Sequence, residues 1–534
     1  MKLALLLALI VLPASAQTER LGTVTFTTSS TVSQSGAFNR GIALLHDFWY
    51  EEAVAQFDQI TKADPACSMA YWGKAMSEFH QIWNRPDEQV MSRSWGALQA
   101  APAAKTARER EYISAAGLFF QPAKQDYQTR IEAYSIAMGR LYAHYPEDVD
   151  AGAFYALSLL AAVSPTDITL NNNHAALAIL NPLFARSPDH PGLVHYIIHA
   201  CDTPSMASQG LKASEHYGEI ASSAPHAVHM PGHIFARLGM WQQDIDSNRL
   251  SVAASDAAEA HHQSGAFDQL HSDDFLLYAY LQSGHDKNSK SLLEQSDTVM
   301  TRLETMPHLS THGMSGMFDE YRSKFAAIYA LEMRDWKTAA QLEPIPAATP
   351  QAQTITYWAR TVAAGHLHQP KLAQESLARF ESLLDKVRQG SQAYLADSTF
   401  EQIRRSEMLG WTAFASGDTQ QALNHMHTAA DLQDKVGQAE VDIPAREMLA
   451  DILLESSPPA AALSEYQRAL VLSPNRFNGL YHAGLAAEQS GDKALAAKYY
   501  EALMKSTDNG SQSTRVEFAH VKDFLAATQV ANTR

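Results

Sequence analysis

Histidine is frequent in this chain of 534 residues, and four of its 23 histidines form two pairs with the same spacing. His195 and His199 are four positions apart, and His229 and His233 repeat that spacing 34 positions further along. Residues four apart lie on one face of a helix, so each pair can offer two imidazole nitrogens to one metal ion. Asp202 follows the first pair at an expected turn and adds a carboxylate. Neutral imidazoles with one carboxylate suit Zn, Cu, Ni or Fe better than Ca or Mg.

Two other interpretations of these pairs remain open: a polar groove that binds a peptide or small ligand, and histidines that pack inside the protein. Pro231 lies within the second pair, so His229 is expected just before a helix, where the four-residue geometry is less regular. The chain has no His-Glu-x-x-His motif, which excludes a zincin-type protease. Phosphate-binding glycine loops, a nucleophile elbow and a Cys-x-x-Cys site are absent as well. A non-enzymatic function is therefore favoured.

The elements that would carry these histidines follow a repeat of 34 residues, in which small residues alternate with an aromatic one. Small residues let two helices approach closely, and the aromatic side chain fills the space between them. The repeated positions are Ala450, Ala462, Tyr466 and Ala469, then Gly484, Ala496, Tyr500 and Leu503, and near the other end Gly41, Ala53, Phe57 and Ile60. A period of this length predicts helical hairpins that stack side by side.

This unit resembles the tetratricopeptide repeat, a helix-turn-helix of 34 residues. Four phrases are similar to those of exported bacterial tetratricopeptide repeat (TPR) proteins, a family distantly similar to tetratricopeptide repeat protein 38. The phrases are ALLHDF at 43–48, AYWG at 70–73, HMPGHIF at 229–235 and PNRFN at 474–478. The resemblance implies an all-α fold, a right-handed superhelical solenoid of TPR-type repeats. It implies no established reaction.

The resemblance also implies which side chains face the concave groove, namely positions 2, 5, 9, 12 and 13 of each first helix. In the N-terminal part, phasing on Gly41 as the small residue of a first helix, and on Gly239 and Gly284 as turns between paired helices, places six polar residues there: His46, His80, His229, His233, His271 and Asp274. The candidate metal ligands are His195, His199, Asp202, His229, His233, His271 and Asp274, whereas His46 and His80 are assigned to the binding of a partner.

In the C-terminal part the same phasing gives a groove that is acidic and contains one aromatic residue. Its residues are Glu447, Asp451, Glu455, Asn478, Tyr481 and Glu488. Such a surface suits a basic or polar peptide. An ordinary solvated face of an acidic protein is the alternative.

Composition and charge restrict the partners and the compartment. With 46% hydrophobic and 19% charged residues the chain is a folded one, and its net charge of −17 argues against nucleic acid or an anionic membrane as partner. Residues 1–16 combine Lys2, an apolar run and a small-residue cleavage site, which indicates a signal peptide and a periplasmic or secreted protein. No later apolar run is long enough to span a membrane.

The chain divides into a Thr- and Ser-rich leader at 17–36, an N-terminal TPR-like array at 37–341, a Pro-rich linker or long loop at 342–353, and a C-terminal TPR array at 354–528. In the leader, Val24 and Phe26 share one face, which favours an extended segment lying along the fold. Cys67 and Cys201 are expected to be buried free thiols, because residues so far apart in a solenoid do not meet.

Taken together, the sequence favours an exported scaffold that binds a protein or peptide partner in its concave groove. The alternative function is that of a metal-binding or metal-dependent protein that uses the two histidine pairs, with Zn, Cu or Fe as the candidate ion. Structural packing of the histidines is the third possibility.

Overall fold

Polar residues and glycines at the expected turns set the ends of the helices. The computed structural model describes residues 19–29, 35–82, 85–265, 268–305, 315–390, 393–438 and 441–532. Asp148, Asp335 and Asp418 each accept a hydrogen bond from a backbone amide in the first turn of a helix. Gly239 and Gly284 lie between paired helices with φ of 63° and 71°, a left-handed conformation that glycine adopts at low cost. The turns predicted at these glycines are confirmed.

All regular secondary structure in the described residues is helical. The N-terminal helices are α1 (Ser35–His46), α2 (Tyr50–Ala63), α3 (Ser68–Ser77), α4 (Glu88–Ala100), α5 (Ala107–Phe120), α6 (Tyr127–His144), α7 (Val149–Ala161) and α8 (Asn171–Arg186). The middle helices are α9 (Pro191–Cys201), α10 (Ala207–Ile220), α11 (Pro225–His229), α12 (Pro231–Arg237), α13 (Trp241–Ala260), α14 (Asp268–Gln282), α15 (Asp286–Glu304), α17 (Ser315–Glu332) and α18 (Trp336–Ala340). The C-terminal helices are α19 (Pro350–His366), α20 (Pro370–Arg388), α21 (Ala393–Ala396), α22 (Thr399–Ala415), α23 (Thr419–Val436), α24 (Ala445–Ser456), α25 (Pro459–Leu472), α26 (Phe477–Gln489), α27 (Lys493–Ser506), the 3-10 turn η2 (Asp508–Gly510) and α28 (Glu517–Asn532).

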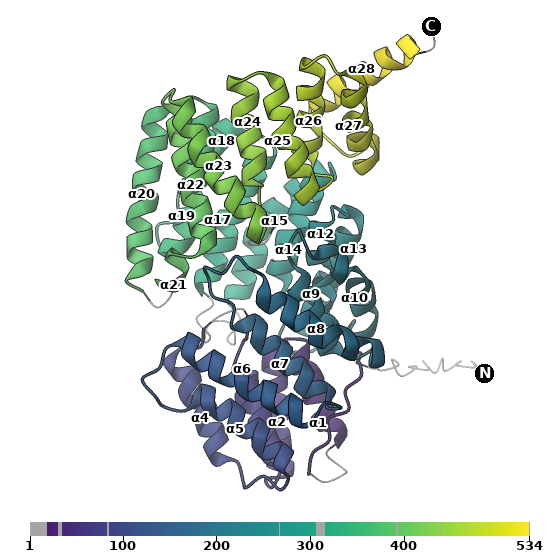
Figure 1. Ribbon diagram of the computed structural model, residues 1–534, viewed down its shortest axis with the longest axis vertical. Helices are drawn as coiled ribbons and strands as arrows, with labels where there is room; N and C mark the ends of the chain where they lie inside the picture. Colours follow the sequence, from purple (N-terminus) through teal and green to yellow (C-terminus); the bar gives the residue numbers. More distant parts are fainter. Residues whose placement is uncertain are drawn as a thin grey trace, which may run out of the picture.

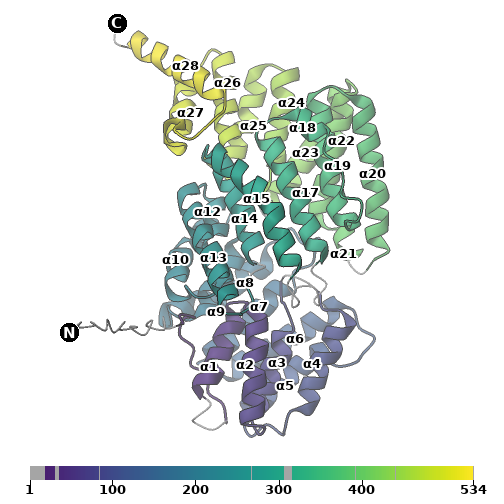
Figure 2. The same cartoon turned by 180° about the vertical axis from the view of Figure 1, so that it is seen from behind.

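Each helix packs mainly against its neighbours in the chain, so that pairs such as α9 with α10 and α22 with α23 stack into a curved solenoid (Figure 1). The N-terminal helices lie at the bottom of Figure 1 and α28 lies at the top. Seen from behind, α12, α13 and α14 lie between these two ends (Figure 2).

The C-terminal repeats bend back onto the middle of the solenoid. Helix α26 packs against α14. The indole Nε1 of Trp241, at the start of α13, donates to the carbonyl oxygen of Asn475 over 2.7 Å. Asp286 at the start of α15 forms a buried ion pair with Arg515, with 3.1 Å between Oδ1 and Nε. Part of the concave side of the C-terminal repeats is therefore covered by the chain itself.

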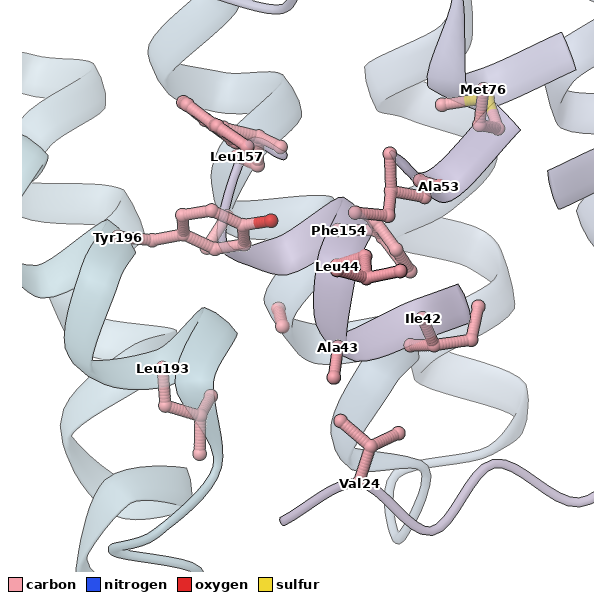
Figure 3. Close-up of a cluster of buried hydrophobic side chains, with 14 of the residues drawn as sticks. Val24, Ile42, Ala43, Leu44, Ala53, Met76, Phe154, Leu157, Leu193 and Tyr196 are labelled. Carbon is pink, nitrogen blue, oxygen red and sulfur yellow. The ribbon is translucent and has the colours of Figure 1, made fainter. Parts of the chain in front are cut away.

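Small residues at the repeated positions allow paired helices to approach closely, as predicted. A Cβ atom added to Gly41 would lie 2.8 Å from the ring of Phe57, and one added to Gly484 would lie 2.4 Å from the ring of Tyr500. Both rings are fully buried. Figure 3 shows part of the N-terminal core, in which Leu44 of α1 belongs to the same buried cluster as Phe57.

The leader lies along the fold, as its alternating pattern predicts. Val24 and Phe26 are buried, and Val24 joins the cluster drawn in Figure 3. The amide of Gly22 donates to the carbonyl of Ile220 over 2.8 Å, which fastens the leader to the end of α10. The signal peptide expected at residues 1–16 lies outside the described residues.

The segment expected as a linker or long loop is a loop over residues 341–349, between α18 and α19. Leu331 and Trp358, on either side of it, belong to one buried core. Cys67 and Cys201 are free and buried, as predicted. Within the described parts of the chain, no helix combines the length and the apolar composition needed to cross a membrane.

Candidate metal centre

Six histidines from successive hairpins meet inside the middle part of the solenoid, and we call them the histidine cluster. They are His195 and His199 on α9, His226 and His229 on α11, His233 on α12 and His271 on α14. The first triad consists of His195, His199 and His226, and the second triad of His229, His233 and His271. Within each triad, one ring nitrogen of every histidine lies within 4.8 Å of the other two.

In the second triad, outward hydrogen bonds leave two Nε2 atoms face to face. Nδ1 of His229 lies 2.6 Å from Oδ1 of Asn248, whose NH2 group in turn donates to Asp244. Nδ1 of His233 lies 2.8 Å from Oδ2 of Asp202. Both of these oxygens are acceptors, so each Nδ1 carries its ring's proton. The two Nε2 lone pairs then face each other across 3.0 Å, and they repel unless a cation lies between them.

His271 completes the second triad from α14. Its ring centroid lies 4.3 Å from that of His229 and 5.5 Å from that of His233, and its Nδ1 lies 3.3 Å from the hydroxyl of Tyr321. Phe275, one turn further along α14, contacts all three imidazoles at centroid distances between 4.5 and 5.5 Å. An apolar ring therefore covers this triad.

The first triad has a similar arrangement. Nδ1 of His195 donates to the backbone carbonyl of His46 over 2.6 Å, which leaves the lone pair on its Nε2. That Nε2 lies 3.0 Å from Nε2 of His199. The ring of His226 lies 5.1 Å from that of His195, and its Nδ1 is 3.9 Å from a carboxylate oxygen of Asp268. The carbonyl oxygen of His46 thus orients the ring of His195 so that its Nε2 faces His199, as hydrogen-bond acceptors behind metal-binding histidines do.

The four-residue geometry of the second pair persists despite Pro231. Helix α11 ends at His229 and α12 begins at Pro231, in the first position of the helix, where a missing N–H is tolerated. Met230 between them keeps helical angles, φ −51° and ψ −36°, although a residue before proline usually avoids them. His229 and His233 therefore share one face, as they would on a continuous helix.

Burial keeps four imidazoles of the cluster neutral. Burial, followed by the neighbouring imidazoles, lowers the pKa of His195, His226 and His229 well below the usual 6.5. The same two causes lower the pKa of His199 to about 3. Neutral imidazole is the form that binds metal ions, so the cluster is prepared for an ion at neutral pH.

The two carboxylates predicted as ligands have other partners, and we correct their assignment. Asp202 accepts hydrogen bonds from His233 through Oδ2 and from Nε of Arg237 through Oδ1, the latter over 2.9 Å. Burial acts to raise its pKa, but Arg237 and His233 outweigh burial and hold the pKa of Asp202 well below its usual range. Asp274 is buried in an ion pair with Lys324. Asp202 therefore orients the ring of His233, and a lysine neutralises Asp274.

His46 and His80, assigned to the partner groove, occupy other places. His46 is fully buried, with Nε2 3.0 Å from Oδ1 of Asp150 and Nδ1 2.8 Å from the hydroxyl of Tyr196. His80 is half-buried in the loop after α3 and stacks on Tyr50 with 4.2 Å between ring centroids. We correct the expectation that His46 faces an open groove, because this part of the concave surface is packed against α7 and α9.

The C-terminal residues expected to bind a peptide are used largely inside the protein. Arg476 is buried and forms ion pairs with Glu332 over 2.8 Å and with Glu447 over 2.9 Å. Asn478 donates to the same Glu332, over 2.9 Å. Asp451 is also buried, and it accepts hydrogen bonds from an arginine and a tyrosine. The predicted role of Glu447, Asp451 and Asn478 in an open groove is therefore corrected: they join repeats to one another.

The other three residues of that predicted groove remain nearer the surface. Glu455 is exposed and lies 3.1 Å from Nδ1 of His366. Glu488 is half-buried and accepts from His520 over 2.8 Å. Tyr481 is half-buried between neighbouring rings. Tyr481 and Glu488 lie beside the same His520, whereas Glu455 lies beside His366.

His226, which lies in the first triad, was not predicted from the sequence. It precedes His229 by three positions instead of four, so it does not belong to a pair of the repeated spacing. A usable signal was Pro225, which occupies the first position of α11 and indicates that a helix begins before both histidines. The direction of each ring then depends on packing against α9 and α14.

Comparison with known proteins agrees with the helical hairpins described above. Residues 447–511 match the tetratricopeptide repeat, and no curated protein matches the chain. Similar solved structures include the human IFIT1 dimer with m7Gppp-AAAA, at 12% identity over 90% of this chain and 91% of that chain with a TM-score of 0.36. Yeast Tom70 is 11% identical over 93% of this chain and 96% of that chain, with a TM-score of 0.31. Together with the stacked hairpins, the repeat match confirms the predicted all-α solenoid of TPR-type repeats.

Proposed function

We propose that this protein binds a transition metal ion through the histidine cluster, on a solenoid scaffold of TPR-type repeats. The observation that carries the proposal is the distance of 3.0 Å between the Nε2 atoms of His229 and His233 while both Nδ1 protons are engaged elsewhere. Two nitrogen ligands of one ion lie about 3.0–3.4 Å apart, because Zn–N bonds are ~2.0–2.1 Å long.

A proton shared between the two rings is the competing explanation. It would require an imidazolium in the interior, and burial lowers the pKa of His229 well below 6.5. A metal ion instead uses both lone pairs as ligands and needs no protonated ring. The hydrogen bonds of His229 with Asn248 and of His233 with Asp202 favour the same explanation, since such bonds fix the ring orientation of metal ligands.

The proposal is tested by metal retention in protein without a histidine tag. After titration with Zn²⁺, Cu²⁺ or Fe²⁺ and removal of free ion by gel filtration, we expect at least one equivalent to stay bound. The double variant His229→Ala with His233→Ala should retain about one equivalent less than the wild type, whereas His425→Ala with His427→Ala on α23 should retain as much as the wild type. An unchanged metal content in the first double variant, or no retained metal in the wild type with any of the three ions, refutes the proposal.

Binding of a protein or peptide partner is the second candidate function, and the match of residues 447–511 to a repeat that commonly binds peptides favours it. Glu455 is the exposed acidic residue of the predicted groove. The partner hypothesis predicts that Glu455→Lys removes a protein that co-purifies with the wild type. It fails if the same proteins co-purify with both.

We also propose that the chain is exported to a periplasm or beyond, because residues 1–16 have the composition of a signal peptide. Relationship to exported bacterial TPR proteins, distantly similar to tetratricopeptide repeat protein 38, is part of this proposal. N-terminal sequencing of the protein from its native cell should give Gln17 as the first residue. A start at Met1 contradicts export by cleavage.

A further inference from the structure

We infer that the histidine cluster is a binuclear copper centre, in which each triad binds one ion and the two ions share a small bridging ligand. This inference rests on the proposed metal-binding function. It adds the number of ions, their identity, and the division of six ligands between them.

The two triads are built in the same way from successive hairpins. In each triad, two histidines four positions apart share one helical face, and the third comes from a later helix of the solenoid. A shift of 34 residues along the chain carries the pair His195 and His199 onto the pair His229 and His233. The period of the fold thus generates a second ion site next to the first, as stacking of repeats predicts.

One phenylalanine ring covers each triad. The ring of Phe48 lies 4.3 Å from that of His195 and 5.6 Å from those of both His199 and His226. Phe275 has the same relation to the second triad, with centroid distances between 4.5 and 5.5 Å. Phe48 also adopts a φ of 58°, which is unfavourable for a residue with a large side chain. Two separate covers indicate two ion sites and not one enlarged site.

The triads adjoin closely enough for two ions to share a ligand. Across their boundary, ring centroids lie 6.0 Å apart for His226 and His229, 6.3 Å for His199 and His233, and 6.4 Å for His226 and His271. Within the triads the corresponding distances run from 4.3 to 6.3 Å, so the boundary is hardly wider than a triad itself. Two-metal sites in other proteins hold their ions about 3.5–4 Å apart.

Ions held about 3.5–4 Å apart leave room between them for a bridge of one oxygen atom. Three protein ligands leave each ion with an open position. A hydroxide bridge fills one position on both ions and supplies negative charge that six neutral imidazoles lack.

Copper fits the ligand set best. Every ligand is an imidazole, and affinity of nitrogen ligands for divalent ions is highest for Cu²⁺. The nearby thiol of Cys201 is buried against α10, where its Cβ lies 2.9 Å from the position that a Cβ of Gly210 would take. Asp202 is held by Arg237, and Asp274 is held by Lys324. The set therefore has neither the thiolates typical of structural zinc sites nor the carboxylates that calcium and manganese prefer.

Copper stoichiometry and electron paramagnetic resonance (EPR) of the full-length wild type test the inference. After titration with CuCl2 and removal of free ion, we expect two copper ions per chain with most of the EPR signal absent, because two Cu(II) spins coupled through one bridging oxygen cancel. One copper per chain, or two with the full signal of isolated ions, overturns the binuclear centre and leaves the proposed function standing. Failure to retain copper, zinc or iron overturns both.

Two single variants test the division of ligands. His226→Ala removes a ligand from the first triad and His271→Ala removes one from the second. Each should lower the copper content from two ions to one and make the remaining ion visible by EPR. His482→Ala is the matched control, since His482 is buried outside the cluster, and it should keep two silent ions. Two EPR-silent copper ions in either triad variant contradict this division of the six ligands. The wild-type measurement needs no variant, so it stays decisive if one of them misfolds.

Discussion

Replacing Asp202 with asparagine should weaken metal binding although Asp202 does not touch the ion. Its carboxylate accepts hydrogen bonds from both His233 and Arg237, over 2.8 and 2.9 Å. An asparagine has one oxygen and one NH2 group, so it satisfies only one of these two donors. If Arg237 keeps the oxygen, the NH2 group faces His233, which must then accept at Nδ1 and carry its proton on Nε2. The lone pair that would bind the ion is lost.

The expected magnitude follows from the kind of contact that is removed. Loss of the acceptor that holds a metal-binding histidine costs about 10–100-fold in metal affinity, or about 1.4–2.7 kcal/mol, and we expect Asp202→Asn to fall in that range. Competition with a chromophoric chelator measures the affinity, and circular dichroism verifies the fold.

Asp286→Asn is the matched control, because it also breaks a buried carboxylate–arginine pair, with Arg515, at a distant place in the fold. It should lower stability and leave metal affinity unchanged. An affinity of Asp202→Asn within twofold of the wild type, or an equal loss of affinity in Asp286→Asn, would refute the reasoning that Asp202 fixes the ligand tautomer.

Three further predictions concern stability. Arg476→Met leaves the carboxylates of Glu332 and Glu447 buried without their cation, and urea denaturation should show a loss of about 3–5 kcal/mol. Burial lowers the pKa of His46 to about 4, so the unfolded chain takes up its proton first as the pH falls below 6.5. The free energy of unfolding should therefore fall by about 3 kcal/mol, from this residue, as the pH is lowered from 6.5 to 4. Urea titrations of the metal-free protein measure this loss. Phe26→Ala removes a ring that is 3% exposed, costs about 3–5 kcal/mol, and should make the leader accessible to limited proteolysis. Unchanged denaturation midpoints or an unchanged cleavage pattern would contradict the respective prediction.

Much of the fold follows from local patterns along the chain. The 34-residue period, the small residues at Gly41 and Gly484, and the turn glycines act over one hairpin at a time, so they could be recognised without knowing the rest of the fold. The pairing of His195 with His199 is local in the same sense, because a helix alone brings residues four apart onto one face. For His229 and His233 the same argument is incomplete, because the helical backbone angles of Met230 between them depend on the packing of the surrounding helices.

What could not be predicted depends on contacts between distant segments. An open groove was expected at Glu447 because phasing within one repeat says nothing of helices elsewhere in the chain. In the structure, α26 returns to α14 and brings Arg476 between Glu332 and Glu447. The partition of charged residues between a surface and an interior is a property of the whole superhelix.

By itself, the sequence determined the type of repeat, the turns at Gly239 and Gly284 and the placement of two histidine pairs on helical faces, because these depend on hydrogen bonds and side-chain spacing within about one hairpin. Only the tertiary structure decided that His226 joins those pairs, that Asp202 accepts a hydrogen bond from His233, and that Asp274 is neutralised by Lys324. The physical reason is that the direction of a buried ring and the partner of a buried charge are fixed by the helices packed against them, and stacking of successive hairpins brings those helices together.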